Sequence, residues 1–370
     1  KINEAIANQL NTLPFYNAFF QCAADVSVQM AKALVDISPA QFNHVFFTNS
    51  GSEANDTNIR LVHRYYDLLG KPNKKIFISR HGAYHGSTVA AGSLGGFGGM
   101  HKQYTGLSYV EHIGQPNWFT EGGDMDKAEF GIKVAQELAA KIDEVGEENV
   151  AAFIAEPIQG AGGVIVPPET YWPEISRICK ERDILLISDE VICGFGRTGD
   201  WFGAQTFGYE PDLMTFAKAV TNGYQPLGGV MVSDKVADVL ASDGGEFTHG
   251  FTYSGHPAAC AAGIATIVAS GNDGFSNALS SPGCISSAIS VGAVDNSDNI
   301  ASFSNSADFL SLLAPGVSIN SSITNNNFGN KSGTSMATPH VAGSWAVLKQ
   351  FSPTQSVDTL INTLKNNGVP

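Results

Sequence analysis

ILLISD, residues Ile184–Asp189, is an apolar run of strand length that ends in a carboxylate. Apolar runs of similar length occur at 76–79 and 151–156, and helical patterns lie between them, such as those over 126–145 and 171–182. Strands that alternate with helices favour a mainly parallel sheet with helices on both faces. We therefore predict an α/β fold whose ligands bind at the carboxyl ends of the strands.

A single lysine, Lys218, lies twenty-nine residues after Asp189 and closes the apolar run Thr215–Lys218. Amines in apolar surroundings have a lowered pKa and are suited to forming a Schiff base. A buried carboxylate at a strand end can keep a pyridine nitrogen protonated, which makes the ring an electron sink. The spacing thus indicates a site for pyridoxal phosphate, with Lys218 as the covalent anchor and Asp189 at the ring nitrogen.

The turn Ser50–Ser52 offers a phosphate site for the same cofactor. It follows a predicted strand at 45–48 and precedes a predicted helix at 53–69. Free backbone N–H groups and the helix dipole favour a phosphate at such a helix N-terminus. We expect Gly51 and Ser52 to be the phosphate ligands.

Each of these features also has an ordinary structural interpretation. A strand-end aspartate is commonly a helix cap or an ion-pair partner, a single lysine is commonly solvated, and a Ser-Gly-Ser turn is commonly only a turn. Their joint occurrence favours the cofactor site. The Gly-rich stretch 92–99 lacks the lysine of a P-loop and is expected to be a loop.

The composition restricts the class of protein. A chain of 370 residues with 43% apolar residues can form one large core or two domains. Its net charge of −14 argues against nucleic acid as a partner, because phosphate backbones need a basic face. No apolar run of membrane-spanning length and no signal-peptide core is visible, so we expect a cytoplasmic protein without a membrane partner. The five cysteines form no metal-binding pair, and no metal site is predicted.

The character of the chain changes near residue 263. Residues 264–370 carry five acidic and three basic side chains, which leaves 30 and 18 for the first 263 residues. The same segment holds 20 Ser and 13 Asn. This change indicates two segments of different origin.

The first segment is similar to the class III, or omega, aminotransferases of fold type I. The likeness covers about residues 1–262 and rests on several long strings. They are FFTNSGSEANDTNIRLV (46–62), AYHGST (83–88), AAFIAEPIQGAGGVIVPP (151–168), LLISDEVICGFGRTG (185–199), TFAKAVTNGYQPLGG (215–229) and HGFTYSGHP (249–257).

The resemblance implies a large domain that binds pyridoxal 5'-phosphate. Lys218 would bind the cofactor and act as general base, and Asp189 would contact the pyridine nitrogen. Tyr84 would stack on one face of the ring and Val191 would pack on the other. Thr252 would reach the phosphate of a neighbouring subunit, so a homodimer is implied.

Two positions point to the substrates. Relatives that act on ornithine or 4-aminobutyrate have Glu where this chain has Ala161, and Gln where it has Ile192. The pattern is more similar to amine:pyruvate and diamine:pyruvate enzymes. We expect an amine or diamine donor and pyruvate or another 2-oxo acid as acceptor.

The family also has an N-terminal segment that lines the pocket, and a small C-terminal domain with an arginine for the substrate carboxylate. Neither is found in this sequence, so 1–262 is interpreted as a large domain truncated at both ends, with impaired turnover.

The second segment, 263–370, contains IVASGNDG (267–274) and GTSMATPHVAG (333–343). A serine at the start of a helix and an asparagine from a distant loop can act as nucleophile and oxyanion donor. Alternatively, Thr334 or Ser335 only caps the helix. Over 263–362 the sequence resembles the subtilisin-like serine proteases, which implies Ser335 as nucleophile and Asn272 as oxyanion-hole donor.

That family also needs an Asp-x-Gly motif and a His-Gly-Thr-His motif, and neither is found here. Without a general base the serine hydroxyl stays protonated, and we predict that proteolysis is absent. Serine peptidase activity stays open as an alternative function, as does a non-functional chimera of two gene fragments.

Overall fold

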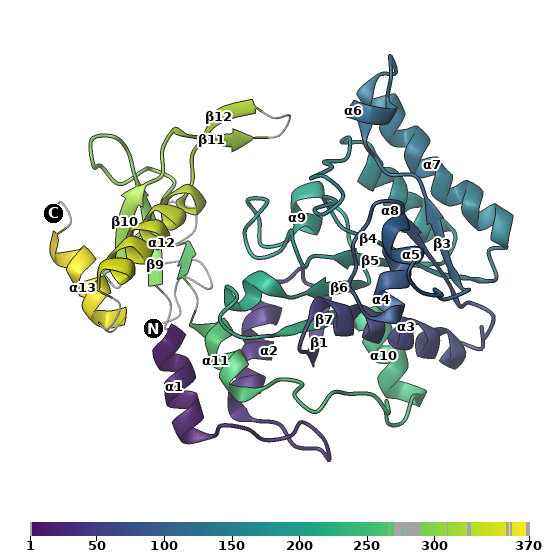
Figure 1. Ribbon diagram of the computed structural model, residues 1–370, viewed down its shortest axis with the longest axis horizontal. Helices are drawn as coiled ribbons and strands as arrows, with labels where there is room; N and C mark the ends of the chain where they lie inside the picture. Colours follow the sequence, from purple (N-terminus) through teal and green to yellow (C-terminus); the bar gives the residue numbers. More distant parts are fainter. Residues whose placement is uncertain are drawn as a thin grey trace. The chain divides into compact units, whose positions relative to one another are not determined.

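The computed structural model describes residues 2–265, 267–269, 276, 289–308, 310–323, 327–352, 355 and 357–367. It divides into two compact units (Figure 1). The larger unit comprises 17–22 and 38–255, and the smaller unit comprises 1–16, 23–37 and 256–370.

The larger unit is built on a seven-stranded sheet of order β1-β7-β6-β5-β4-β2-β3. The strands are β1 (Phe42–Thr48), β2 (Ile76–Arg80), β3 (Val110–Ile113), β4 (Val150–Ala155), β5 (Leu185–Asp189), β6 (Leu213–Phe216) and β7 (Gly228–Ser233). Only β7 runs against its neighbours β1 and β6, and the other pairs are parallel. The predicted α/β fold with a mainly parallel sheet is confirmed for this unit.

Helices cover both faces of this sheet (Figure 1). They are α3 (Gly51–Leu68), α4 (Val89–Leu94), α5 (Gly98–His101), α6 (Trp118–Glu121), α7 (Lys127–Val145), α8 (Tyr171–Glu181), α9 (Gly203–Phe207), the 3-10 turn η1 (Lys218–Thr221) and α10 (Asp234–Asp243).

Strand β5 shows how each face is buried. Leu186 belongs to the core cluster that contains residues of α7 and α8. Leu185 and Ile187 belong to a second cluster that contains residues of α3 and α10. Because successive side chains of a strand point to opposite faces, an all-apolar run buries both.

Local signals begin the two long helices. The Ser50 side chain accepts a hydrogen bond from the Glu53 N–H and caps α3. Asp126 caps α7 in the same way, through the N–H groups of Ala128 and Glu129. These two helix starts agree with the sequence analysis within two residues.

The smaller unit combines the chain's first two helices with its last third. Its elements are α1 (Ile2–Thr12), α2 (Asp25–Ile37), α11 (Pro257–Ile264), β8 (Ile267–Ala269), β9 (Ile289–Val294), β10 (Leu312–Pro315), β11 (Ile319–Ile323), β12 (Asn327–Lys331), α12 (Thr334–Phe351) and α13 (Val357–Asn367). β10, β9 and β8 form a parallel sheet, and β11 and β12 form an antiparallel hairpin.

One expectation changes with the structure. The Gly-rich stretch 92–99 is not a continuous loop, because α4 extends to Leu94 and α5 begins at Gly98. Near the change in composition at residue 263, the chain makes α11 up to Ile264 and then strand β8 from Ile267.

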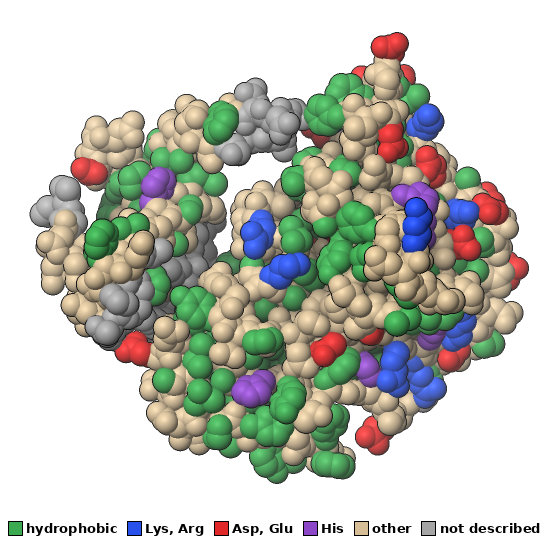
Figure 2. Space-filling model, viewed as in Figure 1, with side chains coloured by type: hydrophobic (Ala, Val, Ile, Leu, Met, Phe, Trp, Pro, Cys, Tyr) green, Lys and Arg blue, Asp and Glu red, His purple; other side chains and the backbone are tan. Residues whose placement is uncertain are grey.

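Among the described residues, no helix is long and apolar enough to cross a membrane. On the face of the larger unit shown in Figure 2, acidic and basic side chains are interspersed.

Candidate functional site

Four strand ends of the larger unit meet at one edge of its sheet. β1, β2, β5 and β6 run in the same direction, because β7 alone is reversed. The residues that follow them are the turn at Ser50, the segment Tyr84–Ser87, Asp189 itself and Lys218. The topology therefore brings the predicted cofactor residues to the edge where α/β proteins bind ligands.

Asp189 is deeply enclosed, with a side chain only 3% exposed. Its Oδ2 accepts hydrogen bonds from His85 Nδ1 at 2.7 Å and from Asn55 Nδ2 at 2.9 Å. Within the described part of the chain, its Oδ1 accepts one bond, from the Val191 N–H at 3.1 Å. A buried carboxylate held this way suits a cationic N–H partner, such as a protonated pyridine.

The N-terminus of α3 offers donors for an anion. The cap bond of Ser50 uses the Glu53 N–H, and no hydrogen bond of the described chain uses the backbone N–H groups of Gly51 and Ser52. Ser52 Oγ accepts from the Ser87 N–H at 3.1 Å, which leaves its own proton for a ligand. These groups fit a phosphate.

Two glycines keep this helix end tightly packed. A Cβ at Gly51 would lie 2.9 Å from a methyl group of Val191. Gly86 has φ +140°, and a Cβ there would lie 2.5 Å from Ser52 Oγ. Val191, the predicted contact of the ring, thus packs directly against the helix N-terminus.

Tyr84 is half-buried after β2, and its backbone is held by a buried carboxylate. Its N–H donates to Glu156 Oε1 at 3.1 Å, and Glu156 Oε2 accepts from the Gly160 N–H at 2.8 Å. The Tyr84 hydroxyl bonds to Ser87 Oγ at 2.9 Å. Glu156 therefore joins the ends of β2 and β4.

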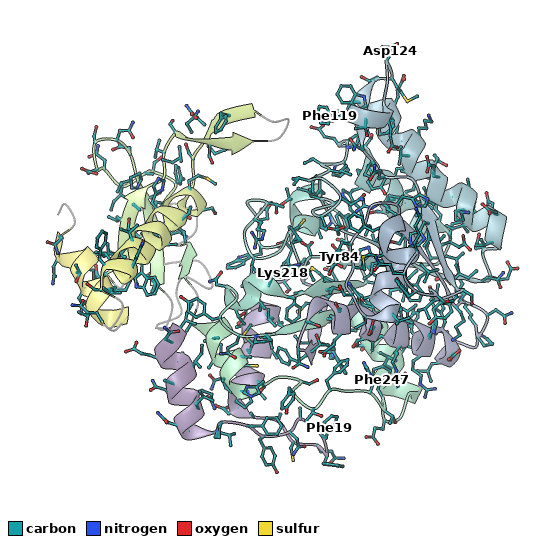
Figure 3. All side chains as sticks on the ribbon, viewed as in Figure 1. Phe19, Tyr84, Phe119, Asp124, Lys218 and Phe247 are labelled. Carbon is teal, nitrogen blue, oxygen red and sulfur yellow. The ribbon has the colours of Figure 1, made fainter. Side chains whose placement is uncertain are left out.

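Lys218 begins η1 directly after β6, with φ +50°. Its neighbours Ala217 and Val220 are buried, but Lys218 itself is exposed. The expectation that the apolar run desolvates this amine is wrong for the described chain, because the backbone turns at the strand end and carries the side chain outward. Figure 3 labels Lys218 and Tyr84 among the side chains of the larger unit.

The remaining predicted residues lie in loops of the larger unit. Thr252 and Ala161 are exposed, and Ile192 is half-buried. A Cβ at Gly160 would lie 3.3 Å from Ile192, so the two positions used to infer the substrate class come from neighbouring loops.

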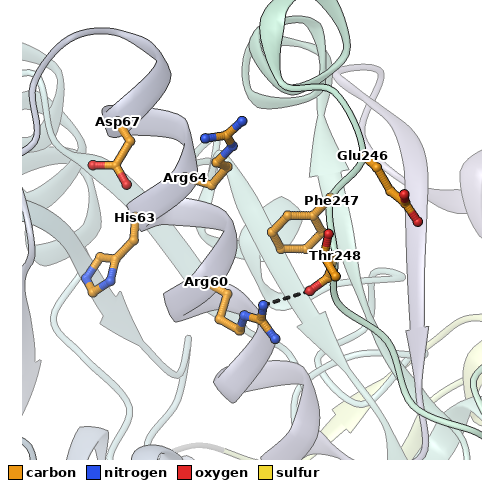
Figure 4. Close-up of a pocket in the computed structure, with 7 residues that line it drawn as sticks. All are labelled: Arg60, His63, Arg64, Asp67, Glu246, Phe247 and Thr248. Atoms are coloured by element: carbon orange, nitrogen blue, oxygen red, sulfur yellow. Dashed lines mark hydrogen bonds between the residues drawn. The ribbon is translucent and has the colours of Figure 1, made fainter.

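An open pocket of about 420 Å³ lies elsewhere on α3 (Figure 4). It is lined by Arg60, His63, Arg64, Asp67, Glu246, Phe247 and Thr248. From the rise of 1.5 Å per residue, these helix positions lie about 13–24 Å beyond Gly51 along the axis. Arg60 donates to the Thr248 carbonyl at 2.8 Å and Arg64 to the Gly244 carbonyl at 2.6 Å. The arginines thus fasten the segment 244–248 to the helix.

His249 is fastened to the same helix. Its Nε2 contacts Thr57 Oγ1 at 2.8 Å, and its Nδ1 contacts Arg60 at 2.6 Å. Because Thr57 donates its own proton to the Glu53 carbonyl, we assign the ring proton to Nε2. Burial and the Arg60 charge lower the pKa of His249 to about 4.

In the smaller unit, Ser335 lies half-buried in the first turn of α12. The N-cap is Gly333, without a side-chain cap bond, so the capping role considered for Thr334 or Ser335 is wrong. No described hydrogen bond joins Ser335 to a histidine or carboxylate, and His340 Nδ1 bonds to the Met336 carbonyl. Asn272 lies outside the described residues.

Family models match both parts of the chain. The model described as "Aminotransferase class-III" matches residues 1–282. The chain belongs to the class-III aminotransferase family. A second model, the "Subtilase family", matches residues 242–369. Both recognised families are thereby confirmed, and the two matches overlap around the junction.

Curated relatives of this class-III aminotransferase chain cover the same part. It is 58% identical over 265 residues to the putrescine–pyruvate aminotransferase of Pseudomonas aeruginosa, covering 71% of this chain and 58% of the relative. It is 46% identical over 273 residues to the mitochondrial gamma aminobutyrate transaminase 1 of Solanum lycopersicum, covering 72% and 53%. The chain thus spans little more than half the length of these relatives.

Solved structures support the fold. The omega transaminase from Pseudomonas jessenii in complex with PMP matches with a TM-score of 0.69 and 45% identity. The match covers 71% of this chain and 59% of that chain. A thermostable (S)-enantioselective omega-transaminase from Thermomicrobium roseum matches with a TM-score of 0.69 and 43% identity, over the same shares. The predicted transaminase fold is therefore confirmed.

Four residues of this site had no role predicted from the sequence: Asn55, His85, Glu156 and Thr215. All four are buried polar side chains. Asn55 and Asn58 lie three residues apart, on one side of a predicted helix. This spacing was the available sign of a buried polar network, because two buried amides need hydrogen-bond partners.

Proposed function

We propose that this chain binds pyridoxal 5'-phosphate and catalyses transamination from an amine or diamine to pyruvate or another 2-oxo acid. The observation that carries the proposal is the buried Asp189 carboxylate, which keeps acceptor capacity at Oδ1 and stands at the sheet edge that also carries Lys218 and the α3 N-terminus. The donor class follows from Ala161 and Ile192 and agrees with the name of the Pseudomonas aeruginosa relative.

The residues present fit the cofactor, which supplies an electron sink for the reacting amine when bound. Asp189 would hold a proton on the ring nitrogen. The N–H groups of Gly51 and Ser52, with the Ser52 hydroxyl, would bind the phosphate. Tyr84 and Val191 would pack on the two faces of the ring.

Lys218 would anchor the cofactor covalently. Its Nζ would also take up and give back a proton during the reaction, the role of a general base. An exposed position suits this exchange, because the amine can move without breaking any described contact. Thr252, also exposed, would bind the phosphate in a second subunit of a homodimer. A cytoplasmic location stays a prediction from the sequence.

The test is reduction with borohydride in the presence of pyridoxal phosphate, followed by peptide mass spectrometry. We expect the protein to gain visible absorbance when the cofactor binds, and to lose it on reduction as the cofactor is fixed on Lys218. Lys218→Ala should show neither effect, while Lys102→Ala, a change at another exposed lysine of the same unit, should show both. A wild-type protein that stays colourless and unmodified at position 218 would refute the proposal.

Turnover is tested separately from binding, with putrescine and pyruvate as the probe pair. We expect alanine to form in the wild-type protein and not in Lys218→Ala. Sedimentation velocity of the same preparation tests the homodimer.

A further inference from the structure

Three buried polar side chains, Asn55, Asn58 and Thr215, connect helix α3 and strand β6 to Asp189. All three residues are 0% exposed. Burying an amide or a hydroxyl costs free energy unless its hydrogen bonds are made. Three such side chains in the core therefore need a physical explanation.

Hydrogen bonds fix the orientation of the Asn55 amide. Its Oδ1 accepts from Thr215 Oγ1 at 2.8 Å and from Asn58 Nδ2 at 3.0 Å. Asn58 Nδ2 also donates to Thr215 Oγ1 at 2.7 Å, which leaves the Thr215 proton for Asn55. With two donors on its oxygen, the Asn55 amide must direct its NH₂ group the other way.

That NH₂ group reaches the Asp189 carboxylate. Asn55 Nδ2 donates to Asp189 Oδ2 at 2.9 Å and to the His85 carbonyl at 2.7 Å. Together with His85 Nδ1, it gives Oδ2 two donors, the number its two lone pairs accept. Among the residues that the structure describes, Oδ1 has a single donor, the Val191 N–H, and so keeps one lone pair.

The network contains buried polar atoms whose hydrogen bonds are not made within the described part of the chain, which costs free energy of folding. Asn58 Oδ1 is buried without a hydrogen-bond partner among the described residues, as is His85 Nε2. Asparagine is also unfavourable inside helices, and Asn55 and Asn58 both lie in the interior of α3. If these side chains only filled space, apolar side chains of similar shape would do so without the free-energy cost of burying polar groups.

We propose that Asn55 is a positioning residue for the cofactor's ring nitrogen. Asn58 and Thr215 orient its amide, the amide saturates Asp189 Oδ2, and Oδ1 is left to accept the hydrogen bond of the ring N–H. This inference rests on the proposed function, and it assigns to the α3 helix a second contribution beyond its N-terminus.

The experiment measures dissociation constants of two ligands by absorbance titration of the full chain. One ligand is pyridoxal phosphate, and the other is its analogue with C–H in place of the ring nitrogen. The variants are Asn55→Ala, Thr215→Val, which keeps the size of the side chain, and Thr215→Ser, which restores the hydroxyl.

We expect Asn55→Ala to bind pyridoxal phosphate about tenfold more weakly, since a hydrogen bond to a charged group contributes about 1.5 kcal/mol or more. Thr215→Val should weaken it about threefold or more, and Thr215→Ser should stay within about twofold of the wild type. The analogue should bind all variants within about twofold, because it has no N–H for Oδ1.

Equal weakening for both ligands would overturn the inference, because it indicates a general packing role. Unchanged affinity of pyridoxal phosphate in Asn55→Ala and Thr215→Val would overturn it as well, while leaving the proposed function intact. If Asn55→Ala does not fold, the Thr215 pair decides. A wild-type chain that binds neither ligand overturns the proposed function and this inference with it.

Discussion

Replacing Gly86 by alanine is expected to be among the most damaging single-methyl changes in the larger unit. The added Cβ would lie 2.5 Å from Ser52 Oγ, 2.7 Å from Ala91 Cβ and 2.8 Å from Ser52 Cα. These atoms belong to the first turns of α3 and α4 and cannot move aside as a flexible side chain could. In addition, φ at Gly86 is +140°, where L residues are strained.

The cost can be estimated from two terms. Overpacking of a tight site costs about 1–3 kcal/mol, and a residue held in an unfavourable backbone region costs about 1–3 kcal/mol more. We therefore expect Gly86→Ala to lower the free energy of unfolding by about 2–6 kcal/mol, a large share of a typical domain's total of about 5–15 kcal/mol.

The assay is urea unfolding followed by tryptophan fluorescence, which reports mainly on the larger unit because Trp118, Trp172 and Trp201 lie there. With a slope of about 3 kcal/mol per molar urea, the midpoint should fall by about 0.7–2 M. The matched control is Gly99→Ala in α5, where a Cβ meets no atom within 4 Å. Equal unfolding midpoints for the two variants would show that the added methyl at position 86 causes neither the clash nor the strain.

Two further predictions concern a buried carboxyl and the protease-like serine. Burial raises the pKa of the Glu190 carboxyl from 4.5 to about 7, so between these pH values the folded protein holds a proton that the unfolded chain has lost. The free energy of unfolding should therefore fall by about 3 kcal/mol as the pH rises from 4.5 to about 7. Unfolding curves of Glu190→Gln, measured over the same pH range, should lack this decrease. Ser335 has no described base beside it, so a fluorophosphonate probe should label the wild type no more than Ser335→Ala; specific labelling would restore the peptidase hypothesis.

The sheet was predictable because its strands are buried on both faces and are therefore apolar throughout. Ile184–Asp189 illustrates this, since its length and composition predict β5 within one residue. Helices α3 and α7 were predictable at their starts, because Ser50 and Asp126 are cap residues. In these cases the local sequence and the tertiary contacts favour the same structure.

The partners of Asp189 were not predictable from spacing alone. Asn55 lies 134 residues before Asp189, and His85 lies 104 before it. Their contact depends on the order of strands in the sheet, which a single sequence does not specify. The exposure of Lys218 was missed for a different reason: apolar neighbours in sequence do not bury a side chain when the backbone takes a φ of +50° between them.

The smaller unit is assembled from distant parts of the chain, since α1 and α2 pack with α11 and residues 256–370 complete it. Ile2 shares its apolar cluster with Ala262 and Ala265. Ending the chain after residue 255 would therefore remove α11, against which α1 and α2 pack, and would expose Ile2 to water. A shortened chain that keeps the transaminase portion therefore has to keep α11 with α1 and α2, and the aminotransferase match over 1–282 includes all three helices.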